Sequence, residues 1–129
     1  EGSNNGDNGN ATPTTDATLK NFTILKGDLA GSEHGMYLKE GAGKWDCQNI
    51  YIDGFTKGLK IKNSTDDPAA NTNVDNGNIV FNPIYFGASI TTQSEYAGTN
   101  STYLTTGTNT GAGNSGATPS WATGWTAGF

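Results

Sequence analysis

The chain has 129 residues, enough for one domain, and a formal net charge of −5, with seven lysines and no arginine. Gly, Thr and Asn account for 53 residues (19, 19 and 15), and because they are poor helix formers but common in turns and strands, a helix bundle is excluded. The acidic balance disfavours nucleic-acid binding, and without an apolar run of membrane-spanning length we expect no membrane insertion.

The N-terminal segment is nearly devoid of large apolar residues. Residues 1–18 are therefore expected to form an extended arm or linker, with order beginning near Leu19. Because Glu1 stands where a starting methionine would be, we expect a processed chain or a fragment of a longer one.

Short strand-like runs separated by turn signals follow, and they repeat. The segment Asn21-Phe22-Thr23-Ile24 matches Asn49-Ile50-Tyr51-Ile52 at a shift of 28 residues, and Gly35-Met36-Tyr37-Leu38 matches Gly58-Leu59-Lys60-Ile61 at a shift of 23. Repeated units of this length are typical of parallel β-helix rungs, which bury their apolar residues by stacking on one another. The sequence thus predicts an all-β chain: a right-handed parallel β-helix of about three rungs over residues 19–87, with 78–81 opening the third.

One cysteine falls within these runs. Because Cys47 is the only one, the chain can form neither an intrachain disulfide nor a cysteine-based metal cluster. Its strand-like surroundings predict a small buried apolar residue rather than a reactive thiol.

The remainder, residues 88–129, has a different composition, with one charged residue and strings of Thr, Gly, Ser and Asn. We expect a long loop over residues 99–120 and an aromatic C-terminal cap formed by Trp121, Trp125 and Phe129, which would pack on the last rung.

The rung segments 19–24, 35–41 and 49–61 and the ending Trp121-Ala122-Thr123-Gly124-Trp125-Thr126 resemble the C-terminal part of a family of Bacteroidetes secreted β-helix surface proteins with a W-x-x-G-W-T terminus. The resemblance implies an extracellular or cell-surface location. It also implies that the missing N-terminal half of the fold comes from the same precursor or from another chain.

Residues able to support catalysis are few. His34 is the only histidine and lies in a turn-like segment, so an exposed loop position is expected, and no nucleophile-elbow motif accompanies it. Asp46 with Asp53, or Asp66 with Asp67, would supply the carboxylate pair of a glycosidase, although the latter pair also suits a solvated turn. Polysaccharide-lyase chemistry would need a lysine of strongly depressed pKa, since arginine is absent.

The sequence predicts no cofactor other than a structural calcium ion. Its oxygen ligands would come from the insertion after residue 61, namely Asp66, Asp67 and Asp75 with Asn73 and Asn76. Because clusters of Asn, Asp and Gly also form turns without a metal, the ion remains one of two interpretations.

Aromatic residues supply the candidate carbohydrate contacts. Stacking on sugar rings would involve Trp45, Trp121, Tyr96 and Tyr103, whereas the terminal tryptophans also suit the predicted cap.

The favoured function is a non-enzymatic structural or adhesive module of the extracellular space or bacterial cell surface. Leu19, Phe22 and Ile24 would form an open assembly edge, completed by the N-terminal portion of the same precursor or by identical subunits. The alternative is a polysaccharide-binding module or part of a polysaccharide-degrading β-helix enzyme.

Overall fold

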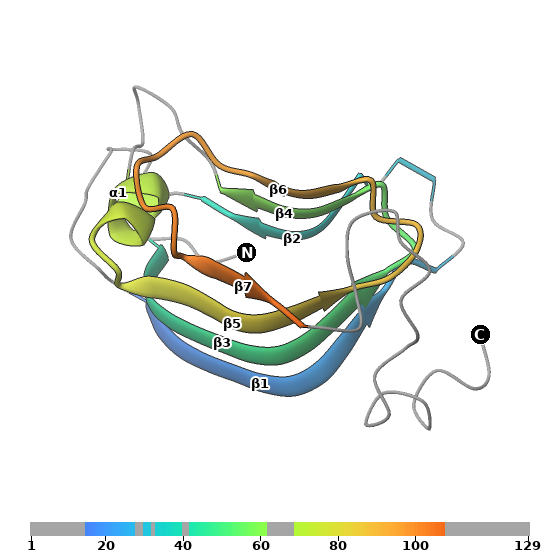
Figure 1. The fold of residues 1–129 in the computed structure, drawn as a ribbon, viewed down its shortest axis with the longest axis horizontal. Coiled ribbons are helices and arrows are strands. Elements are labelled where there is room, and N and C mark those ends of the chain that lie inside the picture. The colour runs from blue at the N-terminus through green and yellow to red at the C-terminus, as the bar shows by residue number, and fades with distance from the viewer. Residues whose placement is uncertain (1–14, 28–29, 32, 40–41, 62–68, 108–129) are drawn as a thin grey trace.

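The computed structural model describes residues 15–27, 30–31, 33–39, 42–61 and 69–107. They form two parallel sheets and one short helix (Figure 1). The strands in chain order are β1 (Thr15–Leu25), β2 (His34–Leu38), β3 (Ala42–Asp53), β4 (Lys57–Ile61), β5 (Ile79–Phe86), β6 (Thr92–Glu95) and β7 (Leu104–Thr106), and helix α1 (Ala69–Asp75) lies between β4 and β5.

The chain passes alternately from one sheet to the other. The first sheet has the order β1-β3-β5-β7 and the second has the order β2-β4-β6, and every neighbouring pair of strands is parallel. Successive coils are therefore β1–β2, β3–β4 and β5–β6, and β7 begins another. The predicted all-β parallel β-helix of about three rungs is confirmed.

The register between coils follows the sequence repeats. Phe22 lies opposite Ile50 and Met36 lies opposite Leu59, which are the predicted shifts of 28 and 23 residues. In the third coil Phe81 lies opposite Cys47, as expected for a rung that opens at residues 78–81. The residues that recur in the sequence are therefore the residues that pair between neighbouring coils.

Left-handed asparagines bend the long strands. Asn21 and Asn49 have φ values of 60° and 52°, and the Asn49 side-chain Nδ2 donates a hydrogen bond of 3.0 Å to Oδ1 of Asn21. Asparagine tolerates this conformation better than most residues do. β1 and β3 curve between their ends (Figure 1). The side chains two positions before and one position after each asparagine both face the core, as Leu19 and Phe22 do around Asn21. In β5 the same place is taken by Asn82 and Pro83, joined by a cis peptide bond.

The core consists of apolar stacks that run from coil to coil. One stack contains Leu19, Cys47, Phe81 and Leu104, a second contains Phe22, Ile50 and Ile84, and a third contains Ile24, Ile52 and Phe86. The members in β3 and β5 are all 0% exposed, whereas those in β1 are only partly buried. Gly58 lets the two sheets approach, because a Cβ there would overlap the Phe86 ring and lie 2.6 Å from the Gln93 carbonyl oxygen.

Helix α1 closes one end of the core. Its Ala70 and Val74 are fully buried, and the Asn73 Nδ2 donates to the Ala42 carbonyl oxygen at 2.9 Å. Asn73 in turn accepts a hydrogen bond from the Asn78 side chain, so this buried amide is satisfied. The helix is therefore fixed to the start of β3.

The predicted boundaries at residues 18 and 87 differ from the observed strands. β1 begins at Thr15, inside the predicted arm of residues 1–18, and β6 and β7 lie inside the predicted loop and cap of residues 88–129. β7 in particular falls within residues 99–120, which were expected to be loop. Backbone pairing explains the difference, since a preformed parallel edge can hold a polar strand that has no apolar alternation.

The position of an isoleucine in its stack determines how much its truncation destabilises the fold. Ile52→Ala removes a side chain that is 0% exposed, between Ile24 and Phe86, and we expect a loss of about 2–5 kcal/mol in the free energy of unfolding. Ile24→Ala, the matched change one coil away, leaves a partly solvated gap and should cost less. Urea denaturation measures both. Equal losses would contradict the stacking order.

Candidate functional site

The first candidate site is the open edge of β1. β1 is the outermost strand of its sheet, and no strand in the described part of the chain pairs with its other side. The structure places the predicted edge residues Leu19, Phe22 and Ile24 there, partly exposed, above neighbours in β3 that are fully buried. Asn21 is exposed beside them. An edge of unpaired backbone groups over an apolar row is a template for another strand.

A second cluster lies on the three-stranded sheet. His34 Nε2 is 2.9 Å from Glu95 Oε2, and Lys57 Nζ is 2.6 Å from Glu95 Oε1 and 3.5 Å from Glu33 Oε2. The expectation of an exposed loop histidine is wrong, because His34 begins β2 and its side chain is only 15% exposed. The signal that could have placed it is the coil register, in which His34 lies opposite Lys57.

Electrostatics fix the charges of this cluster. Hydrogen bonds from Lys57 and then from His34 lower the pKa of Glu95 to about 2, and the hydrogen bond to Glu95 raises the pKa of Lys57. A proton-abstracting lysine needs the opposite shift. Next to it, Lys60 Nζ lies 5.2 Å from the centroid of the Tyr37 ring, so a cation–π contact also links these coils.

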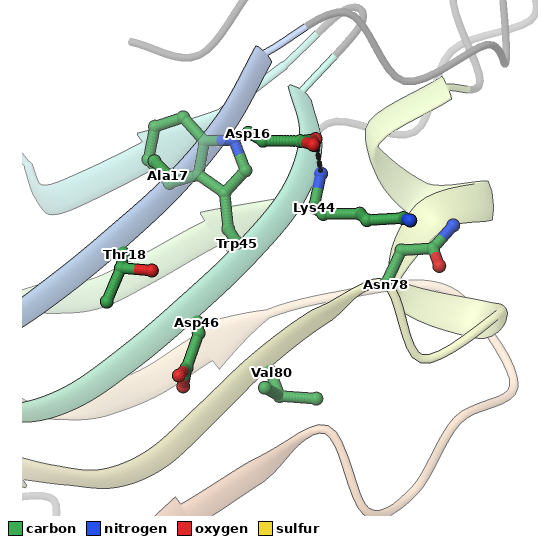
Figure 2. A pocket seen from close by; sticks show the side chains of 8 residues that line it. All are labelled: Asp16, Ala17, Thr18, Lys44, Trp45, Asp46, Asn78 and Val80. Atoms are coloured by element: carbon green, nitrogen blue, oxygen red, sulfur yellow. Dashed lines mark hydrogen bonds between the residues drawn. The ribbon is translucent and has the colours of Figure 1, made fainter.

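A shallow pocket of about 340 Å³ lies near the start of the coils (Figure 2). Asp16 Oδ1 accepts a 3.0 Å hydrogen bond from the Lys44 backbone N–H at its rim. Trp45 lines it, but the indole points away from Asp46 toward Ala17, and Trp45 is only 9% exposed. Trp45, which was one of the predicted carbohydrate contacts, is therefore a core residue. The pocket is lined by Asp16, Ala17, Thr18, Lys44, Trp45, Asp46, Asn78 and Val80.

Tyr96 and Tyr103 pack on each other rather than presenting open faces. Their ring centroids are 4.4 Å apart, both residues are partly buried against the core, and Tyr103 meets Phe81 edge to face. Burial and then the hydrogen bond to Asp75 raise the pKa of Tyr96 to about 12. The fourth candidate contact, Trp121, lies outside the described residues, so sugar binding stays a prediction.

Asp75 holds the segment that follows β6. Its Oδ1 accepts hydrogen bonds from the Tyr96 hydroxyl, from the Thr99 backbone N–H at 2.6 Å and from the Asn100 backbone N–H at 3.2 Å. These bonds, that of Tyr96 foremost, lower the pKa of Asp75. Asp66 and Asp67, its predicted partners in a calcium site, lie outside the described residues, and within those residues no three His, Cys, Asp or Glu side chains could hold a metal ion.

The carboxylates of Asp46 and Asp53 have separate structural partners. Asp46 Oδ2 is 3.2 Å from Lys20 Nζ, and hydrogen bonds from Gln48 and then Lys20 lower its pKa. Burial opposes ionisation of Asp53, yet hydrogen bonds from Ser89, Gly54 and Tyr51 outweigh it and lower its pKa. Neither carboxylate is kept neutral, as the acid of a glycosidase pair would need to be.

Cys47 is fully buried, and the loss of solvation raises the pKa of its thiol to about 12. The prediction of a buried apolar cysteine is confirmed. Such a thiol stays protonated and inert near neutral pH.

The coils, the register and the corner asparagines define the chain as a parallel β-helix. Residues 1–126 match the family described as the pectate-lyase-like β-helix domain, and the chain belongs to that family. Neither the curated proteins nor the solved structures include a significant match. Within the described residues, no helix has the length and apolar character needed to cross a membrane.

The ion pairs of Glu95 make stability depend on acid pH. Because its pKa falls from 4.5 to about 2 on folding, its contribution is present above pH 4.5 and lost as the pH drops toward 2. We expect Glu95→Gln to flatten the fall in unfolding free energy over this window, measured by urea denaturation at stepped pH. Glu33→Gln, which changes a 64% exposed carboxylate near the same lysine, is the control and should leave the slope nearly intact. Parallel curves for wild type and Glu95→Gln would contradict the assignment.

The Asp75 contacts should govern the mobility of the segment that they hold. Asp75→Ala removes the acceptor of the Thr99 and Asn100 amides, and we expect both amides to exchange faster with solvent deuterium. Hydrogen exchange by NMR measures this. Asn76→Ala, at an exposed neighbouring position, serves as the control, and unchanged protection in Asp75→Ala would show that the contacts do not hold the segment.

Proposed function

We propose that the chain is a non-enzymatic structural or adhesive module, in which the β1 edge receives a further β-helix coil. The coil comes from the preceding part of a longer precursor or from an identical subunit. One observation carries the proposal: the inward row Leu19, Phe22 and Ile24 is partly exposed, whereas the same row one coil on is 0% exposed.

The physical gain from an added coil is large. A coil on β1 removes the exposed parts of that row from water, at about 25 cal/mol per Å² of apolar surface. It also pairs backbone groups along an 11-residue strand. Solenoid coils depend on such contacts with their neighbours for much of their stability.

The polar clusters support a role without catalysis. Lys57 is held protonated by Glu95, Asp53 and Asp75 are engaged with backbone and hydroxyl donors, and the thiol of Cys47 is inert. Lys57, Asp53 and Asp75 each join segments that are distant in sequence. Their arrangement suits a rigid scaffold.

The proposed setting is the extracellular space or the bacterial cell surface, as in the Bacteroidetes secreted β-helix proteins that the chain resembles. The resemblance rests on the rung segments and on the W-x-x-G-W-T ending at residues 121–126, which lies outside the described residues. A surface module acting by shape rather than chemistry also fits a chain that is rich in uncharged polar residues.

Polysaccharide binding is the second candidate, and the shallow pocket favours it. Asp16, Lys44 and Asn78 present charged and amide groups there, of the kind that hydrogen-bond sugar hydroxyls. A glycan array on the folded chain would favour this function if Lys44→Ala abolished a specific signal and Lys26→Ala, a lysine change away from the pocket lining, did not.

Insertion of a second copy of residues 15–41 directly before Thr15 tests the proposed function. This segment is one coil, because Thr15 pairs with Ala42. We expect the extended chain to melt at least about 4 °C higher than the original, since the apolar row becomes covered. Calorimetry measures the change, and an inserted segment of scrambled order is the control. An unchanged melting temperature with protease cleavage confined to the added copy would overturn the proposal.

A further inference from the structure

We infer that the partner of the β1 edge is a second copy of this chain, which places its own β1 antiparallel against the first about a two-fold axis. This inference rests on the proposed function and selects one of its two sources for the added coil. The arrangement of residues along β1 carries it, because that arrangement suits a strand that runs in the opposite direction.

The core-facing residues of β1 have the same spacing in both directions along the strand. Lys20 and Asn21, both exposed, lie at the centre of the pattern. Rotation by 180° about the peptide that joins them places Leu19 opposite Phe22 of the second copy. Residues directly opposite each other in an antiparallel pair point to the same face, so the apolar side chains of both copies meet on the core side. The residues of β1 that pack on the core are Ala17, Leu19, Phe22 and Ile24.

The charges at the two ends of β1 are complementary in this arrangement. Asp16 lies at the start of β1, and Lys26 directly follows its last residue. The register sets Asp16 opposite Leu25 of the second copy, beside the Lys26 of that copy, so that two symmetric ion pairs can form. Near the axis, each Lys20 is balanced within its own copy, because its Nζ lies 3.2 Å from Asp46 Oδ2.

The two sheets open at the same end of the fold. β1 and β2 belong to one coil and are the outermost strands of their sheets (Figure 1). A two-fold axis perpendicular to the sheets therefore brings two copies together through both edges.

The other end of the described fold matches β1 less well. There the outermost strand of the first sheet is β7, with 3 residues against 11 in β1. The outermost strand of the second sheet is β6, whose sequence Thr-Gln-Ser-Glu has no apolar residue. The described residues thus favour contact between two β1 edges over head-to-tail stacking. Such a contact uses the same surface on both copies and closes at a dimer.

Cysteine pairing across the axis tests the geometry. Thr18 would lie opposite Thr23 of the second copy, at a Cα separation of about 4.5–5.5 Å that suits a disulfide. Two copies of Thr18 would lie about five residues apart along the strand, too far for a disulfide. The native Cys47 does not interfere, because it is fully buried and the pKa of its thiol is about 12.

Under mild oxidation, we expect an equimolar mixture of Thr18→Cys and Thr23→Cys chains to give disulfide-linked dimers on non-reducing electrophoresis. Each variant alone is the control and should stay unlinked. No cross-linking in the mixture, or equal cross-linking in the single-variant samples, would overturn the antiparallel register.

Sedimentation velocity of the unmodified chain between about 1 and 100 μM supplies the second measurement. We expect a monomer–dimer equilibrium without larger species. Lys26→Glu should raise the Kd of the dimer by about ten-fold, because two attractive pairs become repulsive, and adding Asp16→Lys should restore most of the affinity. Lys60→Glu, on β4, is the matched control and should leave the Kd unchanged.

A monomer at every concentration, growth into larger species, or no restoration by the second charge change would overturn the inference. A gain in melting temperature by the extended chain described above would then leave the proposed function standing, with another segment as the source of the coil. Failure of the extended chain to gain stability would instead overturn the proposed function itself.

Discussion

The vertical register between coils is the constraint on which the rest of this structure depends. Each inward position of β1 meets its counterpart in β3 and β5, as in the stack of Leu19, Cys47 and Phe81. Because side chains alternate between the two faces of a strand, a slip of one residue would turn an apolar row outward. The left-handed asparagines reinforce the register, since Asn49 reaches Asn21 only when the corners lie directly above one another.

The same register organises the polar surface. Lys20 reaches Asp46 across β1 and β3, Lys60 lies over Tyr37 across β4 and β2, and Glu95 joins His34 to Lys57 across all three strands of the second sheet. These contacts tie coils together from outside, as the apolar stacks do from inside. The ion pairs and the cation–π contact therefore add to the cohesion between neighbouring coils.

The sequence could predict the coils because their inward residues recur at fixed shifts, as Phe22 and Ile50 or Met36 and Leu59 do. It could not predict β7, a Leu-Thr-Thr strand that exists because β5 offers it backbone partners. The repeat could place His34 opposite Lys57, but it could not predict the contact of His34 with Glu95, which is 61 residues away and on another coil. The open edge was predictable from the apolar row, but the hydrogen bond from Asn49 to Asn21 depends on left-handed φ values that the sequence pattern does not reveal.

Helix α1 has a consequence for engineering. The helix interrupts the series of strands between β4 and β5. Its Val74 is buried in the core and Asn73 donates a hydrogen bond to the Ala42 carbonyl oxygen, so the chain is fixed to the core before β5 begins. The path from β4 to α1 can therefore change in length without shifting the pairing of β3 with β5. The spacing of the coils is therefore set independently of the number of residues between β4 and α1.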